Sequence, residues 1–365
     1  MQLFGYRVRQ IEKVYIYMGT NTISTDSRRQ YFLDNLKLLL TVLVVFHHAA
    51  QAHNEGAYWP YSFEDTSMLI PWIWKFLSTN ASFFMGLFFL IAGYFVPISY
   101  DRQNAGVFVK KKLLHLGIPC ALMSMILSLM VGHFEIGHMW FVENLLVFSL
   151  LYVVYRLVFK PKYNPTEPRN MTMVWFLVIA MVMGLAVQIV RGFSPQDRWI
   201  NVLNILYFEP ARYPQYVVMF ILGVYMERRR MMENLDCRTG FNCLIIGLLL
   251  TLGNYLRSSG PWGSFVDHWF GFYESMMSIS ICFGLIWVFK ELFNGTNSFF
   301  KWACKQTYAV YIVHLPLMIL IQFLTDGMIT RPIPEFLFIG VVSLVASFLI
   351  SWGINALLEL PKIRK

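Results

Sequence analysis

Residues 171–190 read MTMVWFLVIAMVMGLAVQIV, a run of twenty residues without a charged side chain. An α-helix rises about 1.5 Å per residue, so a helix of this length crosses the ~30 Å hydrocarbon core of a bilayer. A surface helix of a soluble domain would carry a polar face over such a length, and this run shows no such face. The stretch therefore predicts a membrane-spanning helix.

The same pattern recurs along the chain. Of 365 residues, 57% are hydrophobic and 14% are charged, whereas roughly 25% charged residues are typical of soluble domains. Backbone polar groups need internal partners in lipid, which favours helices. We therefore predict an all-α, polytopic membrane helix bundle with about ten transmembrane helices. The other predicted spans lie near residues 33–52, 80–98, 116–133, 139–159, 213–227, 241–257, 269–290, 303–324 and 335–358.

Positive charge predicts the orientation of this bundle. The formal net charge is +9, and Lys and Arg gather in alternate connecting segments, such as 110–112 and 228–230. The positive-inside bias places these segments in the cytoplasm, with both termini cytoplasmic. A basic surface for nucleic acid would need a soluble domain, for which the spans leave no room. We expect a multi-pass protein of the cell (inner or plasma) membrane with no nucleic-acid partner.

The spans define one transmembrane domain, residues 31–360, without a convincing internal repeat. Residues 1–30 form a polar cytoplasmic N-terminal segment without an apolar signal core, so we expect no cleaved secretion signal. Met18 is an alternative start of the chain.

The first span carries two groups that are costly in lipid, Lys37 and His48. Eleven residues at about 100° per residue bring the two side chains to within roughly 20° of the same face, ~16 Å apart along the axis. A cation near the inner surface and an imidazole in the outer half indicate a functional stripe. The alternative is structural: Lys37 snorkels to the headgroups and His48 bonds to a neighbouring helix.

Two more histidines lie close by in the sequence. His47 points about 100° away from His48 on the helix, and His53 lies beyond the predicted membrane edge. Adjacent histidines on a helix diverge, so these three do not make a convincing metal site. We predict no metal.

The two longest predicted outer loops, 53–79 and 191–212, carry several aromatic residues, among them Trp59 and Trp199. Trp and Tyr at such places usually form an interfacial belt, which is the favoured interpretation. A platform on which a sugar stacks is the alternative.

Five ordered segments resemble one known family. Residues 31–37 (YFLDNLK), followed by ten residues and His48, resemble the opening of the acyltransferase-3 family of membrane O-acyltransferases. The other segments are FF at 83–84 with FFLIAGY at 88–94, HMWFV at 138–142, ARYPQY at 211–216 with FILGVY at 220–225, and YAVYIVHLP at 308–316. The fourth is similar to the variant in glucan-modifying members. The sequence departs from the family's pattern at three places: Ala92 and Thr307 stand where the family has Ser, and Lys112-Leu-Leu-His115 stands in place of R-x-x-R.

This resemblance implies an acyl-CoA-dependent O-acyltransferase that transfers a short acyl group to a carbohydrate hydroxyl at the cell envelope. Acetyl is the simplest group, and the likeness to glucan-modifying members makes succinyl the second choice. Acyl-CoA (acetyl-CoA or succinyl-CoA) is then the donor substrate, with no bound cofactor. The other partners are a glycan or polysaccharide acceptor and the lipid bilayer.

The resemblance also suggests roles for particular residues. His48 is the candidate general base, because an imidazole titrates near neutrality, and Lys37 binds or positions the donor. Lys110, Lys111, Lys112 and His115 lie where CoA phosphates would approach, although ordinary positive-inside anchoring explains them equally well. Residues of a possible acceptor pocket or its support are His138, Trp140, Glu143, Arg212 and His314, for which structural roles are the alternative.

Other classes of protein remain as alternatives. A membrane transporter of a glycan or acyl donor predicts broken helices or repeated halves, and tolerance of substitution at His48. A non-catalytic sensor or assembly partner would keep the fold without the chemistry of Lys37 and His48. Another family of membrane acyltransferases would share an embedded histidine but not the five ordered segments.

Overall fold

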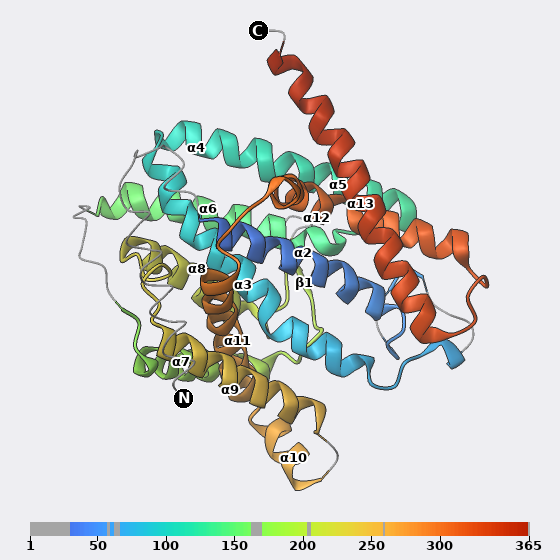
Figure 1. Cartoon of the computed structure of the whole chain (residues 1–365), viewed down its shortest axis with the longest axis horizontal. Helices are drawn as coiled ribbons and strands as arrows, with labels where there is room; N and C mark the ends of the chain where they lie inside the picture. The colour runs from blue at the N-terminus through green and yellow to red at the C-terminus, as the bar shows by residue number, and fades with distance from the viewer. Residues whose placement is uncertain are drawn as a thin grey trace, which may run out of the picture.

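The computed structural model describes residues 30–56, 59–61, 66–161, 170–202, 206–257 and 260–363. Apart from Gln30, the predicted N-terminal segment lies outside these residues. Within them, nine helices are long and apolar enough to cross a membrane, which confirms a polytopic all-α bundle (Figure 1). They are α2 (Tyr31–Gln51), α3 (Ile73–Asp101), α4 to α5 (Ala105–Val131), the turn η4 (Gly137–Met139) with α6 (Trp140–Phe159), α7 (Met173–Phe193), α9 (Cys237–Tyr255), α11 (Phe270–Leu292), α12 (Ser298–Thr325) and α13 (Pro332–Ile363).

Two helices fall outside this group. Helix α8 (Tyr213–Arg228) matches the predicted span at 213–227 but has only 16 residues. Its chain leaves the helix through Arg230, which adopts a left-handed backbone conformation with φ of 48°. Helix α10 (Pro261–His268) is short and exposes the rings of Trp262 and Phe265. The described residues therefore contain nine candidate spans, and the span predicted at 213–227 corresponds to the shorter helix α8.

The third predicted span begins earlier than its apolar run. Helix α4 (Ala105–Lys112) starts at Asn104, whose side chain accepts a hydrogen bond from the Val107 backbone N–H at 2.9 Å. This cap stabilises the first turn, and the helix continues through a π-turn, η3 (Leu113–Gly117), into α5 (Ile118–Val131). The prediction of a start near residue 116 was wrong for the helix because Lys110, Lys111 and Lys112 interrupt the apolar run after only five residues.

Helices α2, α3 and α11 form the centre of the bundle. Of the most apolar 18-residue window of each helix, 72% is buried in α3 and 61% in α11, against 28% in α7, α9 and α13. Figure 1 shows α2 and α3 crossing the middle, with α4 and α5 along one edge and α7 and α9 along the opposite edge. Polar groups on α2 and α3 are therefore shielded from lipid by other helices.

Helices α3 and α8 approach each other closely at two glycines. A Cβ atom on Gly93 would lie 2.2 Å from the carbonyl oxygen of Phe220, and one on Gly223 would lie 2.1 Å from that of Leu90. Small residues allow such backbone contact between membrane helices, where dispersion and packing provide the association energy. The pair of glycines thus holds the short α8 against the central helix.

We expect Gly93→Ala to destabilise the protein by about 1–3 kcal/mol, because the added methyl group must push α8 away. The midpoint of thermal unfolding in detergent, followed by intrinsic fluorescence, measures the effect. Gly192→Ala is the control, since a Cβ there meets no atom within 4 Å. Equal midpoints for the two variants would contradict the close approach.

A small hairpin joins α7 to α8. Strands β1 (Ile200–Val202) and β2 (Leu206–Phe208) pair antiparallel, with Ile200 opposite Phe208. The hairpin belongs to the predicted outer loop 191–212, and its Tyr207 is hydrogen-bonded to Glu143 and Asn144 near the start of α6.

Candidate active site

Three histidines from distant parts of the chain come together. His48 lies near the end of α2, His138 in the turn η4 that precedes α6, and His314 near the middle of α12. The ring centroid of His314 is 5.2 Å from that of His48 and 4.7 Å from that of His138, while His48 and His138 are 6.3 Å apart. This cluster of three imidazoles is the candidate active site.

Backbone carbonyls fix the protons on two of these rings. Nε2 of His138 donates to the Ile312 carbonyl at 3.0 Å, and Nδ1 of His314 donates to the Tyr311 carbonyl at 2.7 Å, because a carbonyl can only accept. In the neutral rings, Nδ1 of His138 and Nε2 of His314 then carry lone pairs. Both atoms are buried without a hydrogen-bond partner among the described residues. Buried polar atoms usually have partners, so these two are ready to accept from a ligand.

Gln51 and Trp59 orient the His48 ring. Nδ1 of His48 is 2.6 Å from Oε1 of Gln51, one turn further along α2, which leaves Nε2 with the lone pair when the amide oxygen accepts. The indole of Trp59 stacks on the imidazole, with centroids 5.7 Å apart and planes at 24°. Its Nε1 donates to Oε1 of Gln322 on α12 at 2.9 Å. The sequence interpretation placed Trp59 in an interfacial belt and did not single out Gln51.

The other two N-terminal histidines have different surroundings. The ring of His47 lies 4.9 Å from that of Phe84 and meets the His48 ring edge-on, with centroids 5.8 Å apart. His53 is fully buried, and its Nε2 is 2.7 Å from a carboxylate oxygen of Glu335. In the described part of the chain, no group of three or more His, Cys, Asp or Glu residues could hold a metal ion.

Lys37 lies at the opposite end of α2 from the three imidazoles. Its Nζ is 2.8 Å from Oδ1 of Asp34 and 5.2 Å from the centroid of the Phe95 ring. The eleven-residue separation from His48 corresponds to ~16 Å along the helix. Lys37 and His48 therefore cannot contact the same reacting carbon.

The basic cluster Lys110 to Lys112 lies on a helix rather than in a loop. Lys110 and Lys111 are exposed, and Lys112 is half-buried with its Nζ 5.4 Å from the centroid of the Phe108 ring. The exposed pair is free to meet an anionic ligand from solvent.

His115 is tied to the histidine-bearing helix through its backbone. The Tyr308 hydroxyl on α12 donates to the His115 carbonyl, and the His115 side chain is exposed. Tyr308 precedes His314 by six residues, about 9 Å along the helix. The backbone of the basic segment and the imidazoles thus contact α12 about 9 Å apart along its axis.

Trp140, two residues after His138, packs against two other aromatic rings. Its indole is stacked with the Tyr216 ring, with centroids 5.3 Å apart, and meets the Trp199 ring at 5.5 Å. Aromatic contacts of this kind fix the first turn of α6. Trp140 therefore supports the candidate site through packing.

Glu143 and Asn144 attach the hairpin to α6. The Tyr207 backbone N–H donates to Oε2 of Glu143 at 2.9 Å, and Nδ2 of Asn144 donates to the Tyr207 carbonyl at 2.8 Å. These two side chains hydrogen-bond to the Tyr207 backbone of β2 as the backbone of a neighbouring strand would. Glu143 thus binds the hairpin backbone, which was not visible from its position in the sequence.

Arg212 belongs to a buried ion-pair network. Its Nε lies 3.2 Å from Glu209 and its Nη1 lies 2.8 Å from Glu274, which also pairs with Arg191. Exposure of these four side chains does not exceed 12%. Two arginines and two carboxylates balance in charge, which favours the structural alternative for Arg212.

Comparison with known proteins gives one match. The model of a family described as an acyltransferase domain matches residues 30–352. The match includes all three imidazoles, Lys37 and the basic cluster. Neither a curated protein nor a solved structure matches the chain.

Proposed function

The chain belongs to the acyltransferase-3 family, and we propose that it transfers a short acyl group from acyl-CoA to a carbohydrate hydroxyl at the cell envelope. The observation that carries this proposal is the meeting of His48, His138 and His314 around two buried lone pairs without partners. A hydroxyl-bearing ligand supplies the missing donors, and a sugar offers several hydroxyls side by side. An alcohol acceptor at this site satisfies groups that are costly to leave unpaired.

In the proposed reaction, Nε2 of His48 takes the proton of the attacking hydroxyl. The hydroxyl oxygen forms a bond to the thioester carbonyl carbon, the carbon–sulfur bond breaks, and the proton passes from His48 to the departing thiolate. The products are the O-acyl ester and free CoA. Gln51 keeps the His48 proton on Nδ1, so that Nε2 stays available as a base.

The donor would approach from the side of Lys37 and the basic cluster. Cations bind phosphate oxygens as point charges, and Lys110, Lys111, Lys112 and His115 are proposed to hold the CoA phosphates. The long pantetheine arm then runs beside α12 from the level of His115 toward His314. Lys37 contributes a further cation to the donor at the inner end of this path.

We expect Lys37→Ala to raise the KM for acyl-CoA about tenfold with a smaller change in kcat, because one hydrogen bond from a charged group to phosphate is lost. Initial rates at varied acyl-CoA concentrations measure the change. Lys301→Ala, at an exposed lysine near the start of α12, is the matched control. Normal activity of the Lys37 variant would contradict its donor-binding role.

Acetyl is the proposed acyl group, with succinyl as the second choice, and the proposed location is the inner or plasma membrane. Purified protein offered acetyl-CoA or succinyl-CoA, together with glycans extracted from the host envelope, distinguishes the two donors. The donor whose CoA is released in the presence of glycan, and not in its absence, is the substrate. Consumption of neither donor with any glycan fraction would contradict acyl-CoA-dependent transfer.

A further inference from the structure

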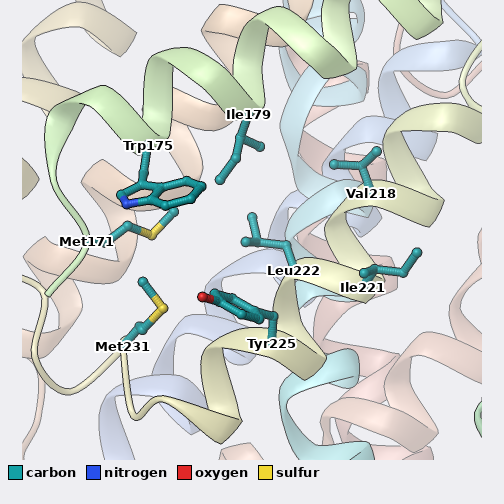
Figure 2. Close-up of a pocket in the computed structure, with 8 residues that line it drawn as sticks. All are labelled: Met171, Trp175, Ile179, Val218, Ile221, Leu222, Tyr225 and Met231. Atoms are coloured by element: carbon teal, nitrogen blue, oxygen red, sulfur yellow. The ribbon is translucent and has the colours of Figure 1, made fainter. Parts of the chain in front are cut away.

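An apolar groove separates α7 from α8, away from the three imidazoles. Its volume is about 310 Å³. Figure 2 shows Trp175 and Ile179 of α7 on one side, facing Leu222 and Tyr225 of α8 on the other. The full lining is Met171, Trp175, Ile179, Val218, Ile221, Leu222, Tyr225 and Met231. Apart from one indole and one phenol, these side chains have no polar atom that could hold a polar ligand.

The gap exists because each helix packs closely on a different neighbour. Gly184 of α7 faces Phe272 of α11 so closely that a Cβ would lie 2.7 Å from the ring, and Gly223 of α8 meets the backbone of α3. The two close contacts direct α7 and α8 away from each other. Protein interiors are normally close-packed, so an open apolar groove at a membrane surface needs an occupant.

The groove is long enough to hold part of an acyl chain within one leaflet of a bilayer. From Val218 to Tyr225 the groove follows seven residues of α8, or about 10 Å, and half of a ~30 Å hydrocarbon core is about 15 Å. It begins at Met171 and Met231, which flank the ends of α7 and α8 on the side predicted to be cytoplasmic. It opens sideways, since Trp175 is 47% and Ile221 is 60% exposed.

A positively charged side chain, Arg229, lies at the end of the groove. The guanidinium carbon of Arg229 lies 5.8 Å from the centroid of the Tyr225 ring, which lines the groove. Arg229 and Arg230 form no ion pair with any described residue, whereas Arg228 is paired with Asp101. The nearby carboxylate of Glu227 also pairs with Arg228, at 3.3 Å. Glu227 also interacts electrostatically with Arg230, which leaves Arg229 as the arginine that can attract an anionic headgroup.

We propose that this groove binds one acyl chain of an anionic glycerophospholipid, with the lipid phosphate at Arg229. The apolar lining selects a hydrocarbon chain, the groove covers about two thirds of the ~15 Å hydrocarbon thickness of one leaflet, and the charge selects an anionic headgroup. The lipid fills the space between the α3–α8 pair and the α7–α11 pair. This inference does not depend on the proposed reaction.

Native mass spectrometry of the purified full chain, titrated with dioleoylphosphatidylglycerol or dioleoylphosphatidylcholine, tests the proposal. We expect one phosphatidylglycerol to be retained at concentrations where phosphatidylcholine is not. Arg229→Gln should weaken its binding about fivefold, the effect of one arginine near a lipid surface. Arg102→Gln, at an exposed arginine outside the groove, should leave binding unchanged.

A second variant tests the groove itself. Val218→Trp fills it and should abolish the retained lipid, whereas Leu185→Trp, at a lipid-facing position of α7 with 54% exposure, should not. Equal retention of the two lipids, or binding unaffected by Arg229→Gln, would overturn the proposal even if Val218→Trp fails to fold. A dimer that forms without lipid and is lost in Val218→Trp would assign the groove to a second copy and would likewise overturn it.

Discussion

His48→Ala is expected to lower the rate of acyl transfer by about 10²–10⁴-fold, the usual contribution of a general base. The substitution removes the ring that contacts His138 and His314 and the base oriented by Gln51. Release of CoA from acyl-CoA by purified protein in the presence of glycan measures this rate. The effect should appear in kcat, because the lost interaction belongs to the transition state.

His47→Ala is the matched control for this prediction. The His47 ring packs against Phe84 and meets the His48 ring edge-on at 5.8 Å, but it is not one of the three clustered imidazoles, so its loss should lower the rate far less than the loss of His48. A transporter would tolerate both substitutions. A His48 variant as active as the His47 variant, at equal amounts of folded protein, would contradict the assignment of the base.

Glu274→Gln is expected to destabilise the fold by about 3–5 kcal/mol, the cost of breaking a buried ion pair by removing one partner. Glu274 is 2% exposed and faces the guanidinium groups of both Arg191 and Arg212. Without its charge, only Glu209 balances these two buried cations. The midpoint of thermal unfolding in detergent and the yield of monodisperse protein measure the loss.

Asp267→Asn provides the comparison for this network. Asp267 pairs with Arg257 at 2.9 Å, but its side chain is 67% exposed, and exposed pairs contribute about 0–1 kcal/mol. We therefore expect a small shift for this variant. If Glu274→Gln unfolds at the same temperature as Asp267→Asn, the buried network does not stabilise the bundle as described.

Hydropathy alone predicted most of the fold. Runs of apolar residues long enough to cross a bilayer need no tertiary information to be recognised, and they correspond to the helices of the structure. The first residues of the helices were harder to predict, because the N-cap of a helix depends on a single polar residue such as Asn104. The sequence predicted the position of helix α8 but not what stabilises it, because the helix is held by contact with α3 through Gly93 and Gly223.

The candidate site was only partly visible in the sequence. His48, His138 and His314 were singled out through the resemblance, but nothing in their spacing places them together, because helix packing decides which faces meet. Trp59 was missed because an outer-loop tryptophan is usually interfacial. Gln51 had a detectable signal: three residues after His48, it lies on the same helical face.

The partners of the other polar site residues could not be predicted from the sequence either. Glu143 is engaged by the hairpin backbone and Arg212 by two carboxylates, and both partners come from other segments. A sequence reveals that a charge lies near a membrane surface, not which group neutralises it. Lys37 and the basic cluster keep their predicted donor-binding roles as proposals that kinetic measurements can decide.

The most direct test of acyl transfer at the three imidazoles is the product mass of envelope glycans. Membranes that contain equal amounts of wild-type protein or His48→Ala are incubated with isotope-labelled acetyl-CoA or succinyl-CoA, and the glycans are analysed by mass spectrometry. We predict a gain of one labelled acyl group with the wild type and none with the variant. An undiminished gain with His48→Ala, or no labelled glycan with either protein, would contradict the account.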